Sequence, residues 1–316
     1  MKKFGYKKAF SMLELVIVMV VLGIVSSMGA TIITQVYQSY IMQRAMYNTT
    51  TSTELASSII YNRLSHRIAR TTVGRSLDGV STEFVNDITN SNTYQVLEWY
   101  GNAVDSFNAN TSSGIPAWSG FCDINAPATN GGNIVTPASD LNLLKTIIPN
   151  LSTTTTVDNM AIIFSSKDFS STQQYDYRCM GYSNTNCIAT INDVDGANNI
   201  IILDNNYTMR IHEQYKLTRS AYALVPVRQR DRDGDGDNDI FDLELRYDYQ
   251  PWEGESFTDS ATPSKTLIEN VSVFRFSGQG DTLRFKICVD EQIGGDSTDA
   301  GDGEYVSICK EKAVIR

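Results

Sequence analysis

The stretch FSMLELVIVMVVLGIVSSMGA, residues 10–30, decides the fold of this chain. It is apolar apart from Glu14 and a few serines, and as a single helix it is long enough to cross a lipid bilayer. The residues before it, MKKFGYKKA, are cationic, and a cationic flank stays on the cytoplasmic side of a membrane. We therefore expect a transmembrane helix over residues 10–33, with the chain after about residue 35 exported.

Glu14 is unusual, because a carboxylate inside a membrane helix costs about 2.5 to 3.5 kcal/mol on insertion scales and generally marks a function. The run AFSMLEL, residues 9–15, resembles the prepilin motif of type IV pilins and type II secretion pseudopilins. The resemblance implies that prepilin peptidase removes the leader 1–9 by cutting between Ala9 and Phe10, and that Phe10 is N-methylated. It also implies that Glu14 neutralises the N-terminal ammonium of a neighbouring subunit during filament assembly. The family usually has glycine where this chain has Ala9, which bears on the efficiency of cleavage.

Two other interpretations of this segment stay open. A signal anchor could hold Glu14 near the lipid headgroups by snorkelling, and a secretory signal peptide could be cut near residues 27–29. A carboxylate at the start of the apolar core fits an ordinary signal peptide poorly. An exported protein that begins at Ala30, or that keeps its leader, would contradict the pilin interpretation.

Residues 34–70 continue the helical pattern beyond the membrane. No proline occurs before Pro116 and no glycine lies between Gly29 and Gly74, so nothing forces the helix to end at the bilayer. Apolar residues recur there at roughly helical spacing. Only the run 48–53 has weak helix propensity, and the helix could bend there.

The rest of the chain, residues 71–316, is expected to form an exported, β-rich head. Residues 71–150 indicate a loop-heavy insertion with a short strand at 94–100 and a short helix at 140–148. Strand patterns follow at 160–164, 199–203, 207–217, 220–228, 241–249, 267–276, 282–289 and 305–315. The sequence therefore predicts an α+β fold, in which an antiparallel sheet packs against the outer half of the long helix.

The segment LIENVSVFRFSGQGDTLRFKIC, residues 267–288, carries a second resemblance. It is similar to the C-terminal sheet of large minor pilins, the J-type and W-type components of secretion and pilus systems. The resemblance implies a minor subunit that primes filament assembly or sits at the tip, with other pilins or pseudopilins, prepilin peptidase and the bacterial inner membrane as partners. The head would lie in the periplasm, or outside the cell in a pilus. The alternative is a calcium-dependent tip adhesin or uptake receptor.

The run DRDGDGDNDIFD, residues 231–242, spaces its carboxylates as an EF-hand calcium loop does, with glycine at the sixth position. It departs from that pattern at two positions, because Asp242 stands where glutamate closes the loop and Asn238 stands where an apolar residue is usual. A strand also follows it, so it resembles the calcium loops of dockerins and thrombospondin-type repeats equally well. A solvated acidic turn is the other interpretation, but so many carboxylates repel one another unless a cation compensates them. We expect a structural Ca²⁺ ion with the ligands Asp231, Asp233, Asp235, Asp237, Asp239 and Asp242.

Five cysteines are present. Cys179 and Cys187 are close in sequence, and Cys288 and Cys309 lie in two strand-like runs, so we expect two disulfides in an oxidising compartment. Cys122 has no expected disulfide partner.

Charge and composition disfavour two classes of function. The formal net charge is −10 at pH 7 and becomes more negative if the lysines of the leader are removed, which disfavours nonspecific binding to nucleic acid. The only histidines are His66 and His212, and the chain has no GxSxG, phosphate-loop or CxxC motif. We therefore expect no catalytic activity.

Overall fold

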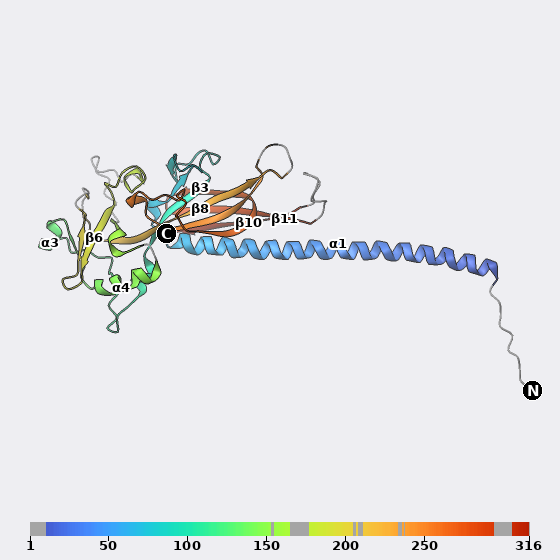
Figure 1. Cartoon of the computed structure of the whole chain (residues 1–316), viewed down its shortest axis with the longest axis horizontal. Coiled ribbons are helices and arrows are strands. Elements are labelled where there is room, and N and C mark those ends of the chain that lie inside the picture. The colour runs from blue at the N-terminus through green and yellow to red at the C-terminus, as the bar shows by residue number, and fades with distance from the viewer. Residues whose placement is uncertain are drawn as a thin grey trace, which may run out of the picture.

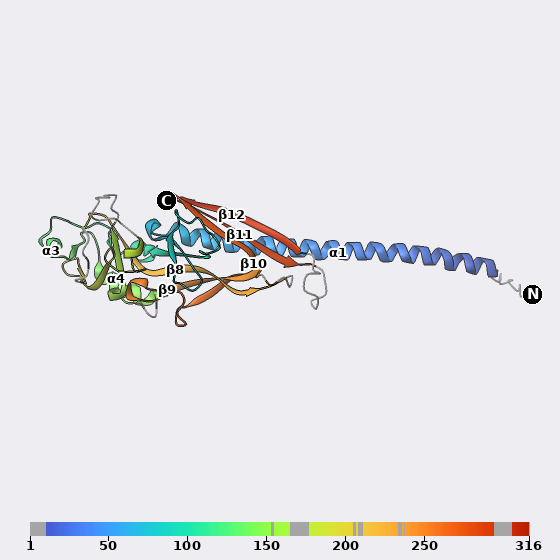
Figure 2. The same ribbon diagram turned by 90° about the horizontal axis from the view of Figure 1, so that it is seen from above.

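In the computed structural model, one long helix carries a β-rich head at its C-terminal end (Figure 1). The structure describes residues 11–152, 155–164, 177–204, 207, 211–232, 236, 238–293 and 305–315. The helix α1 (Met12–Ser65) has 54 residues, which corresponds to a length of about 80 Å at 1.5 Å per residue. Its N-terminal half stands clear of the head, and the head packs only on its C-terminal half (Figure 2).

The ends of α1 are set by local interactions. Ser11 caps the first turn, because its hydroxyl accepts a hydrogen bond from the Glu14 backbone N–H at 3.2 Å. At the other end the chain leaves the helix after Ser65 and forms a bridge between Arg67 and Gly101 of the sheet. This pairing ends α1 earlier than the residue 70 expected from the sequence.

The run 48–53 is helical without a break. The hydroxyl of Thr49 donates to the Ala45 carbonyl at 2.8 Å, and that of Thr53 donates to the Thr49 carbonyl at 2.6 Å. Both threonines are buried against the head, so tertiary packing outweighs their weak helix propensity. The bend considered for this run does not occur.

The head is built on one large antiparallel sheet. Its strands are β1 (Val73–Arg75), β2 (Thr82–Phe84), β3 (Val96–Asn102), β4 (Ile134–Val135), β5 (Ala161–Phe164), β6 (Ala189–Asp195), β7 (Ile200–Leu203), β8 (Tyr215–Arg230), β9 (Ile240–Tyr249), β10 (Ser264–Gln279), β11 (Thr282–Gln292) and β12 (Tyr305–Ile315). They are ordered β12-β11-β10-β9-β8-β5-β6-β7-β4, while β3 pairs with β8 and with β1. Short helices lie between them: α2 (Val104–Asn108), α3 (Pro127–Asn130), α4 (Leu141–Leu151) and the 3₁₀ turns η1 (Ala69–Thr71), η2 (Val157–Asn159), η3 (Tyr177–Cys179) and η4 (Pro251–Glu253).

The core next to α1 fixes the head on the helix. Ala56, Ile60 and Leu64 of α1 are buried against apolar side chains of β3 and β8 to β12. A second core, around α4 and strands β4 to β8, fills the end of the head farthest from the free half of the helix. A third, which contains Tyr100, Tyr249 and Trp252, lies where β3, β5, β8 and β9 meet the turns η3 and η4.

The predicted α+β class, with a long N-terminal helix and an antiparallel sheet, is confirmed. Two details were wrong. The runs 207–217 and 220–228 are not two strands, because a single strand, β8, begins at Tyr215 and continues through Thr218 and Ser220, which are buried. The strand β6 was not predicted.

Within residues 71–150 the expected strand at 94–100 is β3 and the expected helix at 140–148 is α4. The structure adds only the short elements β1, β2, β4, α2 and α3.

Both expected cysteine pairs are bonded. Cys179 and Cys187 close a short loop after η3, and Cys288 and Cys309 join β11 to β12 at directly opposed positions. Cys122 is free and buried, and burial raises the pKa of its thiol to about 11. The last strand is therefore fastened covalently to its neighbour.

Ion pairs also tie β12 to α1. Glu54 of α1 accepts from Lys310 at 3.1 Å and from Lys312 at 3.0 Å, and Lys312 also contacts the Ser58 hydroxyl at 3.0 Å. These contacts hold the C-terminal strand along the outer half of the helix.

Candidate functional site

The N-terminal half of α1 exposes a continuous apolar surface. From residue 11 to residue 44 no described side chain is buried, and the helix is long and apolar enough to cross a membrane. An apolar surface of this extent is unstable in water and needs lipid or other apolar helices around it. This segment therefore has the length and the apolar surface that a membrane-spanning helix needs.

Glu14 lies in the first turn of this surface. It is exposed, and it is the only charged residue between positions 11 and 43. Within the described part of the chain, no ion pair involves its carboxylate. A carboxylate in the first turn is favoured by the helix dipole, but placing it in lipid without a partner is costly.

A line of small residues sets how the head sits on the helix. Ala45, Thr49, Thr53, Ala56 and Ser57 recur at helical spacing and are all buried. The hydroxyls of Thr49, Thr53 and Ser57 donate to carbonyls of α1 itself, so they are buried without losing their hydrogen bonds. The small side chains let the sheet approach the helix closely, and the sequence pattern did not single them out.

The processing residues Ala9 and Phe10 lie outside the described residues. Their roles stay predictions, as does the pairing of Glu14 with a neighbouring subunit.

The acidic loop predicted to hold calcium is only partly described, because Asp233, Asp235 and Asp237 lie outside the described residues. The Asp231 carboxylate accepts from the Gly236 N–H at 2.9 Å. The Asp239 carboxylate accepts from the Arg232 N–H at 3.4 Å, and the Asp239 N–H donates to the Arg230 carbonyl at 3.0 Å. Across the part of the chain that the structure covers, no group of three or more histidine, cysteine or acidic residues is placed to hold a metal ion.

Asp242, the predicted closing ligand of that loop, has other partners. Its side chain is buried on β9, and its carboxylate accepts from Arg230 at 2.8 Å and from Arg228 at 3.1 Å. It also accepts from the Asn270 backbone N–H at 3.3 Å. Arg228 and Asn270 have positive φ and lie at register shifts of β8 and β10, so Asp242 joins two irregular strand segments on either side of β9.

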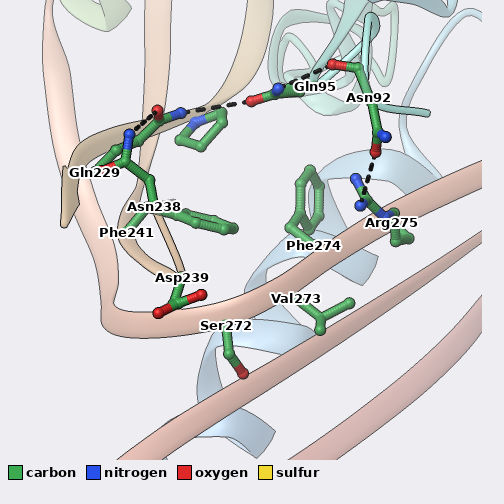
Figure 3. A pocket seen from close by; sticks show the side chains of 11 residues that line it. Asn92, Gln95, Gln229, Asn238, Asp239, Phe241, Ser272, Val273, Phe274 and Arg275 are labelled. Carbon is green, nitrogen blue, oxygen red and sulfur yellow. Dashed lines mark hydrogen bonds between the residues drawn. The ribbon is translucent and has the colours of Figure 1, made fainter. Parts of the chain in front are cut away.

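A polar hollow opens on the head beside these irregularities (Figure 3). Its lining comes from three distant parts of the chain: the loop before β3, the β8–β9 connection, and β10 after Asn270. No sequence pattern indicated this hollow, because its residues come from segments that are far apart in the chain.

Comparison with known proteins supports the interpretation of the N-terminus as a prepilin-type motif. Residues 5–30 match the prokaryotic N-terminal methylation motif. No curated protein and no solved structure matches the chain significantly. The motif, together with the long apolar helix, fits the type IV pilin and pseudopilin family, whose members are structural proteins, are processed by prepilin peptidase and assemble with other pilins. These two features fit a membrane-anchored, pilin-like protein.

Proposed function

We propose that this protein is a minor subunit of a type IV pilus or a type II secretion pseudopilus, which primes filament assembly or sits at the filament tip. One observation carries the proposal. The methylation motif leads into a fully exposed apolar half-helix whose single charge, Glu14, stands in the first turn.

Glu14 and the processed N-terminus form the proposed assembly contact. Cleavage between Ala9 and Phe10 creates an ammonium group at the start of each mature helix, and N-methylation of Phe10 leaves that charge in place. The ammonium of one subunit then neutralises the Glu14 carboxylate of its neighbour as the helices pack. The pairing offsets the insertion penalty of about 2.5 to 3.5 kcal/mol that an unpartnered carboxylate incurs in the membrane.

The size of the head supports a minor rather than a bulk subunit. The head begins after α1 and continues to the end of the chain, and its sheet spreads well beyond the width of the helix. Major pilins tend to be shorter, so a head of this size favours a tip or priming position. We place the protein in the bacterial inner membrane before assembly, with its head in the periplasm, or outside the cell once it is part of a pilus.

The test compares Glu14→Gln with Glu269→Gln, a matched change of an exposed carboxylate on β10 of the head. Mass spectrometry of the wild-type protein should find an N-terminus at a methylated Phe10. We expect Glu14→Gln to remain in the membrane fraction but to be lost from sheared filaments in immunogold images, while Glu269→Gln is incorporated like the wild type.

Three results would contradict the proposal: an intact leader, a mature protein that begins at Ala30, or normal incorporation of Glu14→Gln. Immunogold label on surface filaments would indicate a pilus, whereas label confined to the inner membrane would indicate a pseudopilus.

We also propose that the loop 231–242 binds a structural Ca²⁺ ion. The spacing of its carboxylates supports this, and so does the contact from the Gly236 N–H to the Asp231 carboxylate, which turns the loop back on its first acidic residue. Exported proteins meet calcium at concentrations for which an affinity of about 10⁻⁴ to 10⁻³ M is sufficient.

Calcium titration by calorimetry tests this proposal on the full-length protein. Asp231→Asn should abolish the binding heat. Asp242→Asn distinguishes two roles: a closing ligand would lose calcium binding, whereas a carboxylate held by Arg228 and Arg230 would lower the melting temperature and leave calcium binding intact. Absence of any calcium response in the wild type would refute the proposal. The alternative function, a calcium-dependent tip adhesin or uptake receptor, needs in addition a ligand site on the head.

A further inference from the structure

We infer that the polar hollow between β8, β9 and β10 is a binding site for a neutral saccharide. The hollow has a volume of about 520 Å³, which lies within the range of small-molecule sites. Its eleven lining residues all belong to the described part of the chain (Figure 3). The inference requires only the folded head and is independent of the proposed role in a filament.

The hollow lies where β10 extends past the start of β9. β9 begins at Ile240, and the last pair between the two strands joins Val271 to Phe241, after a register shift at Asn270. β10 continues to Gln279, paired on its other edge with β11. On the other side, β8 has its own register shift between Val227 and Arg230. Bulges of this kind bend a strand and re-aim its side chains. The Asp242 carboxylate bonds to both irregular segments, so the shape of the hollow is fixed by a buried interaction.

Amide side chains form one wall. The Asn238 amide donates to the Gln229 oxygen and the Gln229 amide donates to the Gln95 oxygen, each at 3.4 Å, and the Gln95 amide donates to the Asn92 carbonyl at 2.9 Å (Figure 3). Two of these bonds are long and therefore weak. Each amide has two donor hydrogens and an acceptor oxygen. The bonds between the amides do not use all of these groups, so the remaining donors and acceptors can bond to a ligand.

Such a wall matches sugar hydroxyl groups. Each hydroxyl is one donor and two acceptors, so a polyol can bond to both ends of successive amides. An apolar ligand would leave these amides desolvated without partners, which costs free energy for every group buried.

An aromatic ring supplies the complementary surface. Figure 3 shows the partly buried ring of Phe241 directed into the hollow. Phe274, which is 5% exposed, and Pro226 also line the hollow but are buried. The C–H groups of a pyranose ring pack well on aromatic faces, because the face of the ring carries negative charge density. One polar wall and one aromatic surface together suit a molecule that has hydroxyl edges and C–H faces.

The charges in the hollow favour a ligand without net charge. Asp239 and Arg275 contribute one charge of each sign. The Arg275 guanidinium already donates to the Ser91 carbonyl at 3.2 Å and to the Asn92 side-chain oxygen at 3.1 Å. The protein as a whole is acidic, with a formal charge of −10, so an anionic ligand such as a nucleotide or a sialylated glycan is disfavoured.

The experiment uses the full-length protein in a zwitterionic detergent, because alkyl glycoside detergents present sugars themselves. It is applied to an array of neutral oligosaccharides ending in glucose, galactose, mannose or N-acetylglucosamine. Sialylated and sulfated glycans and a set of short peptides form the comparison arms. We expect binding to at least one neutral saccharide, with its affinity then measured by calorimetry.

Gln95→Ala and Gln229→Ala each remove hydrogen-bonding groups from the wall, and we expect each to weaken binding by about threefold to tenfold. Asn150→Ala is the matched control, because Asn150 is an exposed amide on α4 and does not line the hollow. It should bind like the wild type, and melting curves should show all three variants folded.

Four outcomes would overturn the inference. They are a folded wild type that binds no neutral saccharide, a preference for the charged glycans, a preference for the peptides, and unchanged affinity in both glutamine variants. None of these outcomes bears on the incorporation of the Glu14 variant, so this inference and the filament proposal fail independently.

Discussion

Replacing Glu98 by alanine removes the carboxylate from a buried ion pair that joins β3 to β1. Glu98 is 1% exposed, and it accepts from Arg75 at 2.9 Å and from the Tyr249 hydroxyl at 2.7 Å. The side chain of Arg75 is also largely buried, and its guanidinium lies 5.3 Å from the ring centre of Tyr182. Without Glu98, the Arg75 guanidinium and the Tyr249 phenol remain buried in the head, and each has lost a hydrogen-bond partner.

The magnitude follows from this burial. Breaking a buried ion pair by removing one member typically costs about 3 to 5 kcal/mol, because the other charge stays buried without compensation. A domain has only about 5 to 15 kcal/mol of net stability, so Glu98→Ala should come close to unfolding the head. Glu98→Gln keeps the shape and an acceptor for Tyr249, and we expect it to cost about 1 to 3 kcal/mol.

Urea unfolding of the full-length protein in detergent, followed by tryptophan fluorescence, measures these differences. Glu269→Ala is the control, because Glu269 is exposed on β10, and it should change the free energy of unfolding by less than about 0.5 kcal/mol. A cost below about 1 kcal/mol for Glu98→Ala would refute the reasoning, since it would mean that Arg75 is not left buried without compensation.

The same residue predicts a pH dependence. Burial raises the pKa of Glu98 above its ordinary value, although Arg75 and Tyr249 oppose the shift. A group whose pKa is higher in the folded state stabilises the fold at low pH, and that contribution is lost as the pH rises through the folded pKa. The stability of the wild type relative to Glu98→Gln should therefore increase when the pH is lowered from 7 to 5. A decrease over that range would contradict the sign of the shift.

Three further predictions concern packing and the cysteines. Leu64→Ala, at a fully buried position of α1, should cost about 2 to 5 kcal/mol in urea unfolding, whereas Leu55→Ala, at an exposed position of the same helix, should cost little. The double change of Cys288 and Cys309 to serine should lower stability by about 3 kcal/mol, as expected for the loop that this bond closes, and limited proteolysis should then cut the C-terminal strand first. Cys122 is buried with a pKa of about 11, so it should resist iodoacetamide at pH 8 in the folded protein and react once urea is added; rapid labelling without urea would contradict its burial.

The features that could be predicted from the sequence are those carried by local patterns. The apolar run after Ser11 and its single carboxylate define the helix, and the alternation along residues 267–289 defines β10 and β11 with the turn at Gly280 between them. Both depend on periods of a few residues, and both are present in the structure.

The missed features depend on contacts between distant segments. A polar run at residues 218–220 indicates a break, yet β8 continues because Thr218 pairs with Asn102 of β3 and with Ala161 of β5. The ion pairs of Asp242 with Arg228 and Arg230 depend on bulges that no local pattern specifies. The hollow likewise combines loops and strands that are far apart in the chain.

The continuous helix α1 has a mechanical consequence. The long strands β10 to β12 run broadly along its outer half (Figure 2), and β12 is linked to it through Glu54. A pull along the helix axis therefore loads the backbone hydrogen bonds of these strands in shear, so that many must yield together, and does not peel them apart one at a time. Because β12 is also bonded covalently to β11, we expect the helix and the C-terminal strands to resist such a pull as one unit.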